Sequence, residues 1–133
     1  MSHSASETVT HWLQRLASTA VAGDLEAHMA LISPDLQLFG IPGFEVLEYD
    51  DWRRQCAHEF PQRLVRAIHY SEPRIRTATD RDILFSVIEA IETHDGERTG
   101  QAVEMLLRRE GGHWRLAQQR ILDEDEATHL GLV

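Results

Sequence analysis

The sequence predicts an α+β fold in which three N-terminal helices pack on one face of a curved, mainly antiparallel sheet. Two observations behind this prediction are helical periodicity in the first part of the chain and alternating segments separated by turns in the rest. The third is a length of 133 residues with 42% apolar side chains, which is enough for one hydrophobic core. We therefore expect a single domain over 1–133.

Three helices are expected, over about 4–22, 24–32 and 50–60. Ser4 and Glu7 have the spacing of a capping box, so their side chains can satisfy the first free amides of the first helix. Gly23 suits the end of that helix, because glycine readily adopts the left-handed conformation of a C-terminal cap. Asp24 and Asp50 are placed to cap the second and third helices.

Four main strands are expected, over about 63–79, 82–94, 98–109 and 113–122. A shorter strand around 36–39 precedes the third helix, because apolar and polar residues alternate there. Pro73 is expected to bend or bulge the first main strand. Asp95-Gly96 predicts a two-residue hairpin turn, and Gly111-Gly112 predicts a second one.

Charge and composition exclude several classes of protein. The 22 acidic residues outnumber the 13 basic ones, and the net charge of -9 disfavours nucleic-acid binding. No run approaches the ~20 apolar residues that a membrane helix needs. Residues 1–11 lack the apolar segment of a secretion signal. Cys56 is the single cysteine and cannot form an internal disulfide, so the cytoplasm is the default location.

Metal and cofactor binding are not expected from the sequence. Its eight histidines are scattered and show no HExxH spacing. The glycine pairs lie in predicted hairpins rather than between a strand and a helix, where phosphate-binding loops occur. The acidic run Asp123–Glu126 is expected to be a solvated tail.

Two segments resemble the nuclear-transport-factor-two-like superfamily, which includes ketosteroid isomerase, scytalone dehydratase and the SnoaL-like polyketide cyclases. One is AGDLEAHMALISPDLQLFGIPG at 22–43, and the other is the ending GHWRLA at 112–117. The resemblance implies a cone-shaped fold in which a bent sheet wraps around the helices and leaves an internal cavity. It also implies homodimerisation through the outer face of the sheet.

The mechanism of ketosteroid isomerase does not carry over to this chain. That enzyme uses a tyrosine and two aspartates, and the matching positions here are Leu16, Gly40 and a position near Glu104. A leucine cannot donate a hydrogen bond to an enolate, and a glycine cannot abstract a proton. Two of the three groups are therefore missing.

Hairpin geometry gives an expectation for the two faces of the sheet. With two-residue turns, Glu89 opposes Ala102 and Glu104 opposes Gln119. Both faces are then apolar, which indicates that both are covered, one by the helices and the other by a second subunit. The resemblance places the face with Glu104 toward the cavity.

Two acids in apolar strands are the candidate catalytic residues, Glu104 and Glu89. An acid among apolar neighbours suits general acid or base catalysis. The alternative is an acid at the open rim of the sheet, or one in an ordinary ion pair with an arginine such as Arg74 or Arg76. The candidate substrate-binding residues are Tyr70, Gln119, Trp12, Phe39 and Trp52, each of which could instead be a structural strand or core residue.

These features predict a domain that binds a small apolar or cyclic molecule in its cavity. It could be an isomerase, dehydratase or cyclase that needs no cofactor and uses a buried carboxylate. One alternative is a ligand-binding module without catalysis. The other is a dimeric structural domain, because Arg120–Asp123 is similar to the C-terminal strand of the small subunit of ring-hydroxylating dioxygenases.

Overall fold

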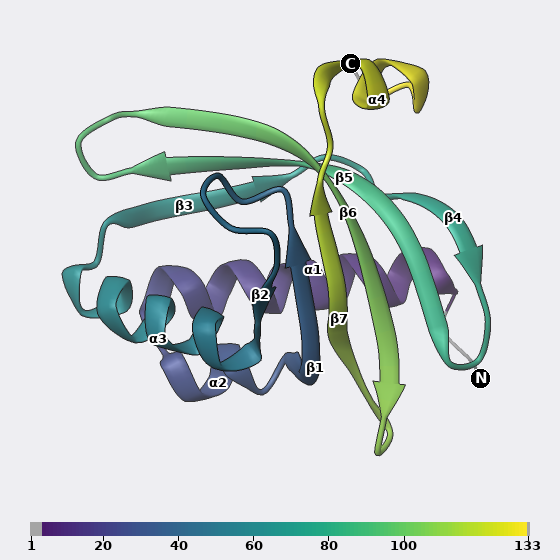
Figure 1. Cartoon of the computed structure of the whole chain (residues 1–133), viewed down its shortest axis with the longest axis horizontal. Helices are drawn as coiled ribbons and strands as arrows, with labels where there is room; N and C mark the ends of the chain where they lie inside the picture. Colours follow the sequence, from purple (N-terminus) through teal and green to yellow (C-terminus); the bar gives the residue numbers. More distant parts are fainter. Residues whose placement is uncertain (1–3, 133) are drawn as a thin grey trace.

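The computed structural model describes residues 4–132. Its α-helices are α1 (Ala5–Ala22), α2 (Leu25–Met29), α3 (Tyr49–Glu59) and α4 (Glu124–His129), and a 3-10 turn spans Phe60–Gln62. In Figure 1, α1, α2 and α3 lie together on one side of a strongly bent sheet, whereas α4 lies apart from them beyond the end of β7. The α+β fold class predicted by the sequence is confirmed.

Caps account for where the helices begin and end. The Ser4 hydroxyl accepts a hydrogen bond from the Glu7 amide at 3.1 Å, which starts α1. Gly23 ends α1 in the left-handed conformation, with φ +68°. Asp24 then caps α2 through the amide of Ala27 at 3.2 Å. The chain becomes extended soon after Met29, so α2 is shorter than the expected 24–32.

All described strands belong to one sheet with the order β2-β1-β7-β6-β5-β3, and β4 also pairs with β5. The strands are β1 (Ile32–Phe39), β2 (Leu47–Glu48), β3 (Val65–Tyr70), β4 (Arg74–Ala78), β5 (Asp82–Thr93), β6 (Arg98–Glu110) and β7 (His113–Ile121). Only β1 and β7 run parallel among the described pairs. The strand expected over 63–79 is divided into β3 and β4 just before Pro73, because proline has no amide to donate to a ladder.

The β5–β6 turn differs from the expected two-residue turn. Thr93 pairs with Glu97 through the Thr93 amide, 2.9 Å from the Glu97 carbonyl oxygen, which leaves a three-residue loop. Gly96 closes this loop with φ +92°, a conformation that glycine accepts without a Cβ clash. Glu89 therefore opposes Gln101 rather than Ala102, and the predicted register is wrong by one residue.

The β6–β7 hairpin has the expected two-residue turn, with Glu110 opposite His113. Its register then shifts, because Leu107 opposes Leu116 whereas Leu106 opposes Gln118. Ala117 is the extra residue of this β-bulge. Glu104 opposes Arg120 as a result, not Gln119 as expected.

The main core lies between α1 and the concave face of the sheet. From α1 it takes Val9, Trp12, Leu13 and Leu16, and from β5 and β6 it takes Phe85, Val87, Val103, Met105 and Leu107. The five strand residues are completely buried. Burial of side chains of this size stabilises the fold by roughly 1.5–3 kcal/mol each. This packing fixes α1 on the sheet and determines which sides of α1 remain open.

The C-terminal segment forms a helix rather than the solvated tail expected from its acidity. Asp123 and Glu126 make a capping box that starts α4. Ala127 of α4 packs with Ala102 and Leu122 in a small second core on the convex, outer face of the sheet. The acidic residues therefore cap a helix whose apolar side covers part of that face.

Candidate functional site

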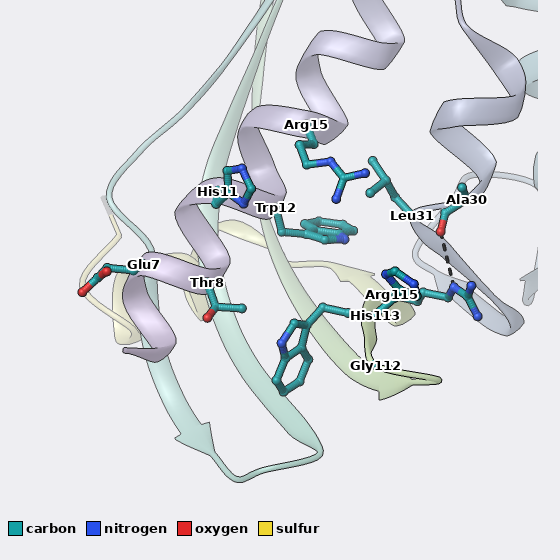
Figure 2. Close-up of a pocket in the computed structure, with 11 residues that line it drawn as sticks. Glu7, Thr8, His11, Trp12, Arg15, Ala30, Leu31, Gly112, His113 and Arg115 are labelled. Atoms are coloured by element: carbon teal, nitrogen blue, oxygen red, sulfur yellow. Dashed lines mark hydrogen bonds between the residues drawn. The ribbon is translucent and has the colours of Figure 1, made fainter. Parts of the chain in front are cut away.

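A pocket of about 650 Å³ opens between the N-terminal half of α1, the chain that joins α2 to β1, and the β6–β7 turn. We call it the hairpin pocket. It is lined by Glu7, Thr8, His11, Trp12, Arg15, Ala30, Leu31, Gly112, His113, Trp114 and Arg115. Figure 2 shows Thr8 and Trp12 of α1 on the side of the helix toward the β6–β7 turn, and Glu7 at the outer edge of the site. Its volume is in the range of small-molecule sites.

Helical spacing places five of these residues along one side of α1. His11 and Arg15 are four residues apart, so they project from the same side of the helix. Trp12 lies between that side and the core. The residue is 3% exposed and packs with the core, yet it also forms a wall of the pocket. The same side chain therefore belongs both to the site and to the main core.

The opposite wall is positioned by the β6–β7 turn and by an arginine anchor. Gly111 and Gly112 both have positive φ, which gives the tight turn that begins β7. The Arg115 guanidinium donates from Nε to the Ala30 carbonyl at 3.3 Å (Figure 2). Its Nη1 lies 3.6 Å from Glu110 Oε1. The Leu116 amide also donates a hydrogen bond to the Leu31 carbonyl oxygen at 2.9 Å, so β7 holds the α2–β1 connection in place.

The lining is cationic although the chain is acidic. The lining contains two arginines and two histidines but a single acid, Glu7. Arg15 is exposed, and no described residue forms an ion pair with it. The net charge of the whole chain is -9. The hairpin pocket is therefore a local positive region that can attract a negatively charged group.

One polar atom in the wall lacks a partner. The Trp12 indole nitrogen is buried and donates to no acceptor among the described residues. Figure 2 shows the ring between Arg15 on one side and Arg115 on the other. A buried N–H without an acceptor costs about 1–3 kcal/mol. Such an atom marks a position where a ligand or a water molecule can complete the structure.

A second pocket of about 350 Å³ lies between α1 and β3. We call it the strand pocket. It is lined by Thr10, Leu13, Gln14, Ala17, Ile68, His69, Tyr70, Ser71 and Pro73. The Tyr70 hydroxyl donates to Glu89 Oε2 at 2.8 Å, and Gln101 donates to Glu89 Oε1 at 3.3 Å. Burial, and then the nearby Glu89 carboxylate, raise the pKa of Tyr70 well above its ordinary value.

Glu104, the first candidate catalytic acid, does not face the helices as expected. It lies on the outer face of the sheet, because the register of β5–β6 places Val103 and Met105 on the concave face. Arg76 donates to its carboxylate at 3.0 Å, and Arg120 lies 3.7 Å from it. The three-residue β5–β6 loop and the bulge at Ala117 shift the register and account for the difference from the expected position.

The other candidates are dispersed. Phe39 also lies on the outer face, since it pairs with Arg120 and alternates with the buried Leu38, so its expected place at the cavity is wrong. Gln119 opposes Met105 on the concave face. Trp52 is partly buried and packs from α3 against the main core. Of the seven candidates, Trp12 lines the hairpin pocket and Tyr70 lines the strand pocket.

The sequence-based list missed most of the hairpin pocket. His11 and Arg15 flank Trp12 on one helix, and His113, Trp114 and Arg115 follow the glycine turn directly. Helical spacing and the clustering of aromatic with basic residues after a hairpin were usable signals. No local pattern indicates that these two segments, about a hundred residues apart, meet in space.

Some kinds of site find no support among the described residues. No group of three or more histidine, cysteine, aspartate or glutamate side chains in residues 4–132 is arranged to hold a metal ion. Burial raises the pKa of the Cys56 thiol to about 12, so the thiolate is disfavoured near neutral pH. No helix in that range is long and apolar enough to cross a membrane.

Solved structures with this architecture come from several bacteria. A nuclear-transport-factor-two-like protein of unknown function from Shewanella oneidensis MR-1 has a TM-score of 0.74 and 11% identity, over 88% of this chain and 98% of that one. One from Pseudomonas putida KT2440 has a TM-score of 0.74 and 14% identity, over 95% and 93%. A Novosphingobium aromaticivorans protein, proposed to be a scytalone dehydratase, has a TM-score of 0.68 and 12% identity, over 86% and 80%.

Identities this low show the fold and not the activity. No curated protein matches the chain. A family model described as the SnoaL-like domain matches residues 9–121, which is most of the sequence and includes α1 from Val9 onward, the whole sheet and the β6–β7 turn. The chain therefore belongs to the SnoaL-like domain family, and it shares its fold with nuclear-transport-factor-two-like proteins.

Proposed function

We propose that this protein binds a small planar or cyclic molecule in the hairpin pocket. The observation that carries the proposal is that two tryptophans, Trp12 from α1 and Trp114 from β7, line one pocket of about 650 Å³. Indole rings present large apolar faces that suit a flat ligand. The pocket is partly open, so a molecule can enter without unfolding of the core.

The positions of Glu89 and Glu104 favour ligand binding, rather than catalysis by a carboxylate, as the role of the hairpin pocket. Glu104 is on the outer face and pairs with two arginines. Glu89 is hydrogen-bonded to Tyr70 and Gln101. Neither acid lines the hairpin pocket. A reacting group held there would have no carboxylate from β5 or β6 within its lining.

A thermal-shift screen tests the proposal. The compounds are small cyclic ketones, lactones and aromatic molecules, and the proteins are wild type, Trp114→Ala and Glu104→Gln. A ligand at a hundred times its Kd adds about 2.7 kcal/mol, which raises Tm by several degrees. We expect Trp114→Ala to lose most of this rise and Glu104→Gln to retain it. A stabilising compound that Trp114→Ala binds as well as wild type would contradict the proposal.

A second candidate function is acid–base catalysis at the strand pocket. The observation that favours it is the Tyr70–Glu89 hydrogen bond of 2.8 Å beside that pocket. A carboxylate paired with a tyrosine can act in an isomerase, dehydratase or cyclase. The same screen separates the two sites. A compound that binds the strand pocket should no longer raise the Tm of Tyr70→Phe, but it should still raise the Tm of Trp114→Ala.

A further inference from the structure

The charges around the hairpin pocket leave one cation without a counterion. Arg15 forms no ion pair with any described residue, whereas Arg115 lies 3.6 Å from Glu110. Glu110 is also held by the Ser33 hydroxyl, which donates to its other oxygen at 2.8 Å. Within the lining, Arg15 thus supplies a positive charge that a ligand can neutralise, and Arg115 supplies a fixed guanidinium.

The guanidinium of Arg115 is partly preorganised. Its Nε is used by the Ala30 carbonyl, and no described residue accepts a hydrogen bond from its Nη2. An arginine whose orientation is already fixed loses little freedom when it binds an anion. The wall between the two arginines is the Trp12 ring, whose buried N–H lacks an acceptor (Figure 2).

We propose that the ligand of the hairpin pocket is an aromatic carboxylate. Its carboxylate lies between Arg15 and Arg115, one oxygen accepts the Trp12 indole N–H, and its ring packs against Trp114. This inference rests on the proposed function and adds the charged group of the ligand. Hydrogen bonds between guanidinium and carboxylate are short and strong, and they satisfy the one polar atom that the wall leaves unpaired.

The amount of available charge favours a carboxylate over a phosphate. Glu110 already offsets much of the Arg115 charge, so the two arginines together leave about one positive charge for the ligand. A doubly charged phosphate would bring a second negative charge that these two arginines do not balance.

The test uses naphthoate, the neutral naphthamide of the same ring, and naphthyl phosphate, titrated by calorimetry into the full chain. We expect naphthoate to bind at least about tenfold more tightly than naphthamide, since a hydrogen-bonded charge is worth about 1.5–3 kcal/mol. Naphthyl phosphate should bind more weakly than naphthoate. Arg15→Gln and Arg115→Gln should each weaken naphthoate binding about tenfold more than they weaken naphthamide binding.

Two controls separate this effect from general changes in charge. Arg66→Gln removes an exposed arginine on β3, 3.3 Å from Glu92 and outside the lining, and should bind naphthoate like wild type. The indole N–H signal of Trp12 in a nitrogen–proton correlation spectrum, identified by its absence in Trp12→Phe, should shift with naphthoate. It should shift much less with naphthamide.

Each outcome decides the inference. Equal affinity for naphthoate and naphthamide would overturn the inference that the ligand carries a carboxylate, but it would leave the proposed binding function standing. Tighter binding of the phosphate, or equal losses in Arg66→Gln and Arg15→Gln, would also overturn it. If no naphthalene compound binds, the inference fails, and the independent thermal-shift screen decides whether the proposed function fails with it.

Discussion

His28 is a buried histidine at the junction of the first two helices. It is 5% exposed, its Nδ1 lies 2.9 Å from the Thr19 hydroxyl, and its ring packs edge-on against Phe60. Burial disfavours the imidazolium ion and lowers the pKa of His28 to about 4. The residue therefore contributes to packing as a neutral ring.

This pKa predicts a loss of stability in acid. Above pH 6.5, His28 is neutral in both the folded and unfolded states, but between 6.5 and about 4 the unfolded chain binds a proton that the folded chain does not. The free energy of unfolding should fall over this window by up to about 3 kcal/mol. Urea unfolding at several pH values measures it.

The His28 effect is isolated by comparing variants. His28→Gln cannot titrate, so its stability relative to wild type should improve steadily as the pH falls from 6.5 to 4. His58→Gln, an exposed change on α3, should follow the wild-type profile. A constant difference between His28→Gln and wild type at every pH would rule out this explanation.

At the scale of elements, one glycine determines the register of the β5–β6 hairpin. Gly96 has φ +92°, and a Cβ there would contact nothing within 4 Å, so the cost of a side chain is in the backbone alone. Gly96→Ala should destabilise the protein by about 1–2 kcal/mol. Gly100 is the matched control, because it lies in β6 with ordinary φ and its nearest atom is 3.9 Å away.

The two glycine variants are compared by chemical unfolding. Gly100→Ala should be neutral or stabilising by up to about 1 kcal/mol, since alanine restricts the unfolded chain. If Gly96→Ala were as stable as Gly100→Ala, the loop would not need a positive φ at this position. The three-residue turn would then not be what sets the β5–β6 register.

Most element types follow from local pattern, whereas the length of α2 and the presence of α4 do not. The caps at Ser4 and Gly23 are visible in the sequence, because each depends on residues a few positions away. The length of α2 is not visible in the sequence. Leu31 and Ile32 fit the apolar face of a helix as well as they fit the beginning of a buried strand. The second core on the outer face, rather than helix propensity, accounts for α4.

At the scale of the molecule, the outer face of the sheet remains the expected homodimer surface. α4 covers its Ile88 and Ala102 end, whereas Leu84 and Leu106 form a half-buried pair that α4 does not cover. We expect sedimentation to give about twice the chain mass of 15.2 kDa. Leu106→Glu should return the protein to a monomer, because it places a charge within that surface.

The matched control for Leu106→Glu is Gln55→Glu, an exposed change on α3 in the helical layer. It should sediment like wild type. A monomeric wild-type chain, or a dimer that both variants retain, would show that the outer face does not mediate association. A monomeric wild-type chain would also remove the support for a structural role like that of the dioxygenase small subunits.

The order of the first three helices and of the strands, the caps at Ser4, Gly23 and Asp24, and the family all follow from the sequence, since these depend on neighbours in the chain and on patterns that relatives share. The expected cap at Asp50 is wrong, because the N-cap of α3 is Glu48. The tertiary structure decided which acids face the helices. A loop residue at Gly96 and a bulge at Ala117 each shift the register, and with a period of two, a shift of one residue exchanges the faces. It also decided the site, because the hairpin pocket joins α1 to a turn that follows it by about a hundred residues, and packing on one shared core brings them together.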